Sequence, residues 1–170
     1  QLHWILLIES PRDLLNLKEI CLSSRRISAI ALGGEDYAAS LQVKRTVEST
    51  ELLYARMVIA NTAKAFGLDA LDTPFTDVDD EEGLRSNMKL SKQLGMNGML
   101  LIGPRQVETV NRFFSPNPFE IDEAAEILRL YQENRDKGLG VFSYRGKMVD
   151  ATVVKRAQQI VTMAEKRGLL

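Results

Sequence analysis

The chain has 170 residues, and 22 lysines and arginines oppose 23 aspartates and glutamates, so its net charge at pH 7 is −1. This length is enough for a domain with a hydrophobic core. The basic residues are scattered, which argues against a nucleic-acid-binding surface. The longest apolar runs have the length of strands, so no membrane span is predicted. Cys21 is the one cysteine. It excludes an internal disulfide, fits a reducing compartment and is predicted to be a buried structural thiol.

Strands and helices alternate along the first two thirds of the chain. Apolar runs bounded by polar turns predict strands at about 4–8, 27–33, 69–76 and 98–102. A helix is expected from Ser10-Pro11 because proline is favoured in a first turn, and Gly33–Asp36 is interpreted as a loop. Further helices are expected at about 47–66 with Gly67 as its C-terminal cap, from 79–82 to about 94, and after Pro104.

This alternation with short connections predicts an α/β fold with a right-handed parallel sheet. Four strand–helix units make half of a (β/α)8 barrel of the TIM type, and an open sheet of four or five strands is the alternative from length alone. Gln1 is not an initiator, and the chain enters its first strand almost at once. We therefore expect about the last four units of a barrel within a longer protein.

The pattern changes after the Pro-punctuated break at 113–118. A helix at about 120–137, a hairpin turning on Arg145-Gly146 and a helix at about 151–166 are predicted next. The predicted domains are residues 1–114, the C-terminal half of the barrel, and residues 115–170, a C-terminal extension.

Two carboxylates follow neighbouring strands. Glu9 comes directly after the first strand, and Asp36 comes just after the second. Parallel strands end at the same edge of a sheet, where α/β proteins build their sites. Two oxygen ligands side by side suit Mg²⁺. The alternative role of Glu9 is a helix cap, although Ser10 already supplies one; Glu35 is expected to be a hydrogen-bonding residue instead of a third ligand.

Other polar residues are given structural roles by their local sequence. Asp79 and Asp80 are interpreted as capping or solvated residues, and Asp150 as the N-cap of the last helix. Arg56 is expected to form a structural ion pair or to bond to a loop.

Six short motifs occur in register over nearly the whole chain, and together they resemble the citrate lyase beta-subunit-like family within the HpcH/HpaI aldolase/citrate lyase superfamily. They are Leu7–Ser10, Gly34–Asp36, Leu53–Arg56, Thr76–Leu84, Pro104–Val107 and Gly146–Asp150.

The resemblance implies a Mg²⁺-dependent carbon–carbon lyase that acts on malyl-, citramalyl- or citryl-type thioesters of coenzyme A or an acyl carrier. It implies that Glu9 and Asp36 bind the metal, that Glu9, Gly103 and Pro104 contact the substrate, and that Asp150 is the catalytic acid–base of a neighbouring subunit. The extension 115–170 would then take part in the subunit contact of a homotrimer. Gly103 departs from the family, which usually has histidine there.

The chemistry agrees with such a site. Breaking a carbon–carbon bond beside a carbonyl leaves an enolate, and a divalent cation can neutralise the charge as it develops. The rival functions are a metal-dependent aldolase acting on a free 2-keto acid and a catalytically silent homologue acting as an accessory subunit. We expect a cytoplasmic or mitochondrial protein that is not secreted. The 170 residues alone are expected to be inactive and to associate through their open sheet.

Overall fold

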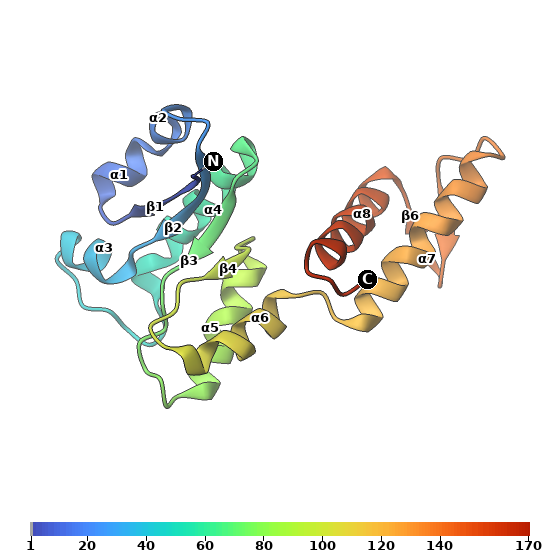
Figure 1. Cartoon of the computed structure of the whole chain (residues 1–170). Coiled ribbons are helices and arrows are strands. Elements are labelled where there is room, and N and C mark those ends of the chain that lie inside the picture. Colours follow the sequence, from blue (N-terminus) through green and yellow to red (C-terminus); the bar gives the residue numbers. More distant parts are fainter. Residues whose placement is uncertain (1) are drawn as a thin grey trace. The chain divides into compact units, whose positions relative to one another are not determined.

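The computed structural model describes residues 2–170 and divides the chain into two compact units, Gln1–Phe114 and Ser115–Leu170 (Figure 1). The first unit is a four-stranded parallel sheet with helices, and the second is a helical hairpin with a small two-stranded sheet. Within residues 2–170, none of the helices combines the length and the hydrophobicity needed to cross a membrane.

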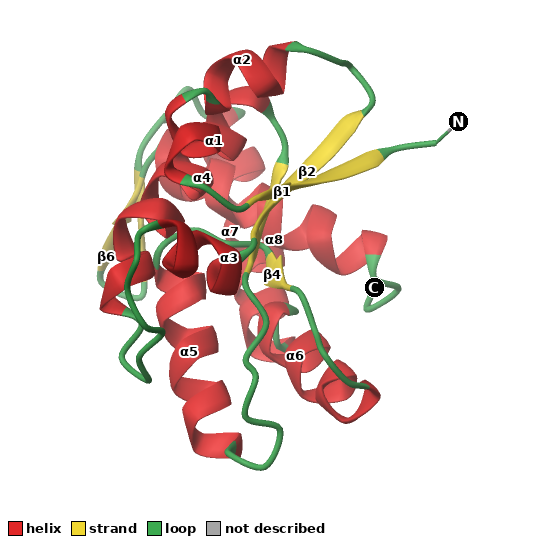
Figure 2. Ribbon diagram, turned by 90° about the vertical axis from the view of Figure 1, so that its left-hand side faces the viewer, coloured by secondary structure: helices red, strands yellow, loops and turns green. Residues whose placement is uncertain are grey.

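The sheet of the first unit is parallel throughout, as the alternation predicts. Its strands are β1 (Trp4–Ile8), β2 (Ile27–Leu32), β3 (Asp69–Asp72) and β4 (Gly98–Met99), in the order β1-β2-β3-β4. Figure 2 shows β1 and β2 side by side, and Leu6 pairs with Ile30 in their register. The last two strands are shorter than the predicted 69–76 and 98–102. Beyond β3 the chain reaches Pro74, which has no N–H to donate to a ladder.

The helices of the first unit end and begin at the local signals in the sequence. Ser10 caps α1 by accepting from the Asp13 N–H at 3.2 Å, and Asp80 caps α5 by accepting from the Gly83 N–H at 2.8 Å. Gly67 ends α4 in the left-handed region, with φ 68°. The helices are α1 (Pro11–Leu15), α2 (Leu17–Leu22), α3 (Gly34–Ser40), η1 (Thr50–Leu52), α4 (Leu53–Phe66), α5 (Glu81–Gln93), η2 (Pro104–Gln106) and α6 (Val107–Phe114).

Two of the predicted boundaries in this region are wrong. Gly33–Asp36, predicted as a loop, is the N-cap and first turn of α3. The predicted helix at 47–66 begins later, because residues 45–49 form a loop and η1 precedes α4. The Glu51 carboxylate of η1 holds this loop by accepting from the Thr46 N–H at 3.0 Å, the Thr46 hydroxyl at 2.8 Å and Arg45 Nη1 at 2.6 Å.

The sheet has one face covered by helices and one open face at β1. Ile8, Ile30 and Leu32 belong to the core formed with α1, α2 and α4. The side chains of Ile5 and Leu7 point to the opposite face, because successive residues of a strand alternate, and they are 56% and 50% exposed. β1 is also an edge strand. An open apolar face and edge agree with the expectation of an incomplete barrel.

A buried polar network joins the helix-covered face of β3 to α4 and α5. Arg56 Nε donates to Asp72 Oδ1 at 2.9 Å, and both side chains are fully buried. Arg56 Nη2 donates to Asn87 Oδ1 at 3.0 Å, and the Ser91 hydroxyl donates to Asp72 Oδ2. The prediction that Arg56 forms a structural ion pair is confirmed. Cys21 is buried as predicted.

The second unit follows the predicted order of helix, hairpin and helix. Its elements are α7 (Pro118–Arg135), β5 (Phe142–Tyr144), β6 (Lys147–Val149) and α8 (Ala151–Lys166). Asn117 and Glu120 form a capping box at the start of α7. Arg145 and Gly146, with φ 49° and 76°, make the hairpin turn. Positive φ at both central residues is the geometry of the tight hairpin turn that was expected.

Candidate functional site

Glu9 lies at the carboxyl edge of the sheet, one residue past β1. The Gly33 N–H donates to the Ile8 carbonyl at 3.0 Å, so the β1–β2 ladder continues to the point where Glu9 and Gly33 are neighbours. Glu9 also continues the alternation of Ile5 and Leu7, which places it on the open face of the sheet. The two neighbouring strands thus deliver Glu9 and the turn that contains Asp36 to one edge.

The Glu9 side chain lies directly against Gly33. A Cβ atom at position 33 would lie 2.9 Å from Glu9 Oε1 and still closer to its Cγ. Glycine is therefore required here for the observed position of the carboxylate. The Glu9 N–H donates to Asp13 Oδ2 at 3.3 Å, which fixes the backbone. Because Ser10 is the cap of α1, Glu9 is not needed as a cap, and the alternative role is wrong.

Gly34 lets α3 approach the end of β3. Its N–H donates to Thr73 Oγ1 at 3.0 Å. A Cβ at Gly34 would lie 2.6 Å from that oxygen and 2.8 Å from Leu52 Cδ1. The two consecutive glycines therefore act as a pair: Gly33 accommodates Glu9, and Gly34 seats the helix that carries Asp36.

Asp36 is exposed in the first turn of α3. A carboxylate is favoured there by the positive end of the helix dipole. Glu35, its neighbour, accepts from Arg45 Nε at 3.0 Å. This ion pair agrees with the expectation that Glu35 is a hydrogen-bonding residue and leaves Glu9 and Asp36 as the candidate metal ligands at this edge.

Gly103 and Pro104 lie past the carboxyl end of β4. Because the sheet is parallel, this is the edge that also carries Glu9 and the turn of Asp36. Gly103 is the N-cap of η2 and has extended backbone angles, φ −158° and ψ 155°. A Cβ at this position would meet nothing within 4 Å. Gln106 anchors the turn by donating from its Nε2 to the Phe75 carbonyl at 3.0 Å. A side chain at position 103 would therefore begin in open space.

Asp150 belongs to the second unit and is half-buried. It caps α8, and its Oδ1 accepts from the N–H groups of Thr152 at 2.9 Å and Val153 at 3.0 Å. The N-cap role indicated by the local sequence is confirmed. The role of acid–base across a subunit boundary stays a prediction.

The carboxylates at the sheet edge are suited to a hard cation. Glu9 makes no side-chain hydrogen bond or ion pair with any other residue among 2–170 and lies in a cradle that a Cβ would fill. No group of three or more His, Cys, Asp or Glu side chains that could hold a metal ion occurs in this described part of the chain. Mg²⁺ is commonly held by one or two carboxylates together with water and substrate oxygens. Glu9 and Asp36 fit that kind of site.

Sequence reasoning missed the importance of Gly33 and Gly34 for this site. The sequence pattern placed both glycines only in a loop after the second strand. The signal was present in the sequence, since two glycines between a buried strand and an acidic pair indicate a close approach of other groups. Only the tertiary structure shows that the approaching groups are Glu9 and Thr73.

Comparisons with known proteins agree on one family. The family model of the HpcH/HpaI aldolase/citrate lyase family matches residues 1–104. The chain is 42% identical to citrate lyase subunit beta of Leuconostoc mesenteroides over 99% of its own length and 56% of that protein. It is 35% identical to the mitochondrial citramalyl-CoA lyase of Mus musculus, over 92% of the chain and 49% of that protein. The chain spans about half the length of the relatives it matches.

Solved structures give the same result for the fold. Protein CitE from Mycobacterium tuberculosis, in complex with magnesium, acetoacetate and coenzyme A, matches with a TM-score of 0.79 and 26% identity, over 96% of this chain and 61% of that one. A citrate lyase from Burkholderia xenovorans matches with a TM-score of 0.83 at 20% identity, over 96% and 53%. The chain thus has the α/β fold of about half of a citrate lyase TIM barrel.

Proposed function

Because the chain belongs to the HpcH/HpaI aldolase/citrate lyase family, we propose that it is the C-terminal part of a Mg²⁺-dependent carbon–carbon lyase. Its substrates are thioesters of the malyl-, citramalyl- or citryl-CoA type or the corresponding acyl-carrier thioesters. One observation carries the proposal: the Glu9 carboxylate lies against Gly33, beside the turn of Asp36, at the carboxyl edge of the parallel sheet.

In this proposal Glu9 and Asp36 hold Mg²⁺, and Glu9 also faces the substrate. An ion held by these residues would supply positive charge beside the reacting carbonyl. The protein contributes rigidity: Glu9 is held through its backbone by Asp13, and α3 is held through Gly34 by Thr73. Fixed ligands lower the cost of reorganisation when charge develops.

The remaining roles come from two further segments. The backbone at Gly103-Pro104 contacts the thioester part of the substrate, without the imidazole usual in the family. During cleavage, Asp150 of a neighbouring subunit in a homotrimer accepts the proton of the substrate hydroxyl and then donates it to the enolate carbon. Its Oδ1 accepts two backbone N–H groups, which fixes the carboxyl group at the start of α8.

Relatives support the choice of substrate class and compartment. One relative is a citramalyl-CoA lyase, and the matched CitE structure contains magnesium, acetoacetate and coenzyme A. For the protein of which this chain is part, we propose a cytoplasmic or mitochondrial location.

Mg²⁺ binding to the 170-residue chain, measured by isothermal titration calorimetry, tests the metal site directly. We expect Glu9→Gln and Asp36→Asn each to weaken binding at least about tenfold, since each removes one of two charged ligands. Glu35→Gln is the matched control: it removes a carboxylate from the same helical turn, and we expect little effect because Glu35 pairs with Arg45.

Gly33→Ala tests the geometry of the site without removing a ligand. The added methyl group would displace the Glu9 carboxylate, so we expect Mg²⁺ binding to weaken at least about tenfold. The backbone angles at Gly33, φ −88° and ψ 79°, lie at negative φ, so the fold should be retained. Gly140→Ala is the control, since a Cβ there meets nothing within 4 Å. Equal Mg²⁺ affinity of Gly33→Ala and Gly140→Ala would contradict the proposed site.

Cleavage assays on the longer protein separate the lyase from its rivals. Activity on malyl-, citramalyl- or citryl-CoA, absent with free 2-keto acids, supports the thioester lyase. Activity on free 2-keto acids alone would assign the aldolase. Normal oligomers that neither bind Mg²⁺ nor cleave any of these substrates would assign an accessory subunit.

A further inference from the structure

The turn that carries Gly103 and Pro104 has one buried side chain. Residues 102–107 are exposed or half-buried except for Gln106, which is 4% exposed. Gly103 adds no side chain to the packing, and its N–H donates to no group among residues 2–170. Its carbonyl accepts from the Gln106 N–H at 3.3 Å. The path of this turn therefore depends on Gln106.

The Gln106 side chain joins the turn to a loop that is distant in the sequence. Its Nε2 donates to the Phe75 carbonyl at 3.0 Å, and the two residues are 31 positions apart. A second link between the same loops, Arg105 to Asp79 at 3.6 Å, has side chains that are 80% and 86% exposed. An exposed ion pair of this kind contributes little to stability. Gln106 is thus the buried connection between the β3–α5 loop and the Gly103–Pro104 turn.

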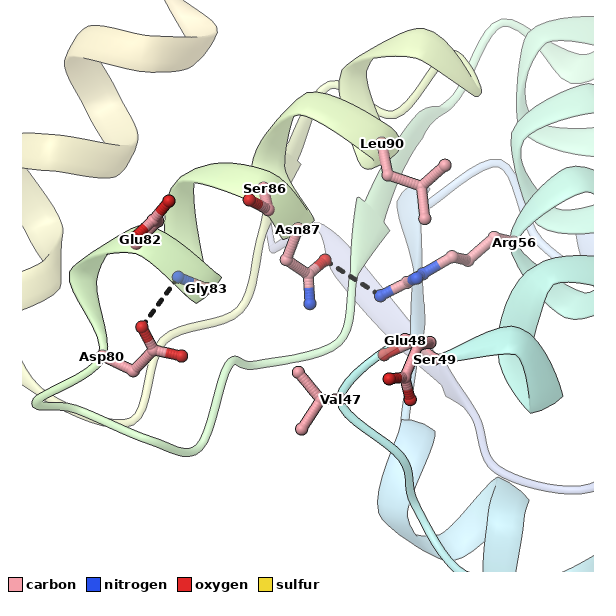
Figure 3. Close-up of a pocket in the computed structure, with 10 residues that line it drawn as sticks. All are labelled: Val47, Glu48, Ser49, Arg56, Asp80, Glu82, Gly83, Ser86, Asn87 and Leu90. Atoms are coloured by element: carbon pink, nitrogen blue, oxygen red, sulfur yellow. Dashed lines mark hydrogen bonds between the residues drawn. The ribbon is translucent and has the colours of Figure 1, made fainter.

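Phe75 is itself held in place by the start of α5. A Cβ atom at Gly83 would lie 2.7 Å from Phe75 Cζ, so the aromatic ring packs directly on the helix backbone. Figure 3 shows Gly83 in the first turn of α5, where its N–H donates to the Asp80 carboxylate at 2.8 Å. Phe75 also packs against the hydrophobic cluster that contains Met88. Gln106 therefore bonds to a well-anchored part of the fold.

Stability alone does not account for a glutamine at this position. Gln106 Oε1 is buried and accepts no hydrogen bond from the described part of the chain. A buried acceptor without a donor is unfavourable. An apolar side chain of similar length would fill the same space without that cost. What the glutamine adds is the bond from its Nε2, which fixes the turn against Phe75.

We propose that Gln106 is a positioning residue for thioester binding. It holds the Gly103–Pro104 backbone at the carboxyl edge of the sheet, in the place where the thioester part of the substrate binds. This inference rests on the proposed function, which assigns that contact to Gly103 and Pro104. A contact made equally with the bound substrate and the transition state affects KM and leaves kcat unchanged.

Gln106→Met in the longer protein tests the proposal through kinetics. Methionine keeps the length of the side chain and removes both the donor to Phe75 and the unpaired acceptor. The substrate is the malyl-, citramalyl- or citryl-CoA thioester that the wild type cleaves. We expect its KM to rise at least about fivefold, with kcat changed by less than about twofold. Mg²⁺ affinity, measured by calorimetry, should be unchanged, because Gln106 bonds to Phe75 and not to a proposed metal ligand.

Hydrogen–deuterium exchange with mass spectrometry tests the same role without an activity assay. In Gln106→Met, residues 73–77 and 100–107 should exchange at least about threefold faster, while the remainder of the chain is unchanged. Gln93→Met is the matched control, since it makes the same change at an exposed glutamine of α5 and should alter neither exchange nor KM. The melting temperature of Gln106→Met should shift by no more than about 4 °C, because removing the unpaired acceptor offsets the lost bond.

Three outcomes would overturn the inference. One is an unchanged KM in Gln106→Met when the wild type cleaves the thioester, whatever the exchange shows. Another is an equal rise of KM in Gln106→Met and Gln93→Met. The third is a loss of folding or of Mg²⁺ affinity in Gln106→Met, which would assign Gln106 a general structural role. A wild-type longer protein that cleaves none of these thioesters would instead refute the proposed function, and the inference would fall with it.

Discussion

Replacing Arg56 by methionine should strongly destabilise the first unit. Methionine keeps the length and helix propensity of the side chain but leaves Asp72 buried without its cation. Removing one partner of a buried ion pair costs about 3–5 kcal/mol. The Thr73 N–H, at 2.8 Å, and the Ser91 hydroxyl still donate to Asp72. We therefore expect a loss near the lower end of that range, about 3 kcal/mol.

Urea denaturation followed by circular dichroism measures this loss. With a slope of about 2 kcal/mol per molar urea, a loss of about 3 kcal/mol lowers the midpoint by about 1.5 M. Adding Asp72→Asn removes the uncompensated charge and should recover part of the stability, which a double-mutant cycle quantifies.

Arg112→Met is the matched control within the same unit. Arg112 pairs with Glu108 at 2.5 Å, but the two side chains are 79% and 82% exposed. An exposed pair of this kind contributes about 0–1 kcal/mol. If Arg56→Met cost no more than Arg112→Met, or if Asp72→Asn recovered nothing, the buried network would contribute no more to the fold than an exposed ion pair.

Two further predictions concern Gly103 and Glu51. Gly103→His should change the free energy of unfolding by no more than about 0.5 kcal/mol, since a side chain there enters open space. Loss of folding in a thermal melt would contradict this stability prediction. The same variant should raise thioester cleavage by the longer protein. Burial raises the pKa of Glu51, but hydrogen bonds from Thr46 and Arg45 outweigh it and lower the pKa from 4.5 to about 2. The stability that this carboxylate contributes is present above pH 4.5 and lost as the pH falls from about 4.5 to about 2. Glu51→Gln should therefore reduce the loss of stability over that window in urea titrations; an unchanged pH profile would refute this.

Local signals in the sequence were sufficient for much of the fold. Ser10, Gly67 and Asp80 end or begin helices by interactions within four residues, and such contacts are readable from sequence alone. The parallel order also followed from strand–helix alternation, because consecutive strands joined by short helical connections usually lie side by side. Failures occurred where a distant residue decided the local structure. The Gly34 N–H bonds to Thr73, 39 residues away, and this contact seats α3 at the position predicted as a loop.

The candidate site divides in the same way. The sequence by itself determined that Glu9 and Asp36 follow neighbouring strands, and parallel pairing then requires them to share an edge. It also indicated that Arg56 would be paired. Only the tertiary structure decided that Glu9 lies over Gly33, that Asp72 is the partner of Arg56, and that Nη1 of Arg56 is left without an acceptor. Each of these depends on packing between segments that are far apart in the chain, and periodicity and capping signals carry no information about such contacts.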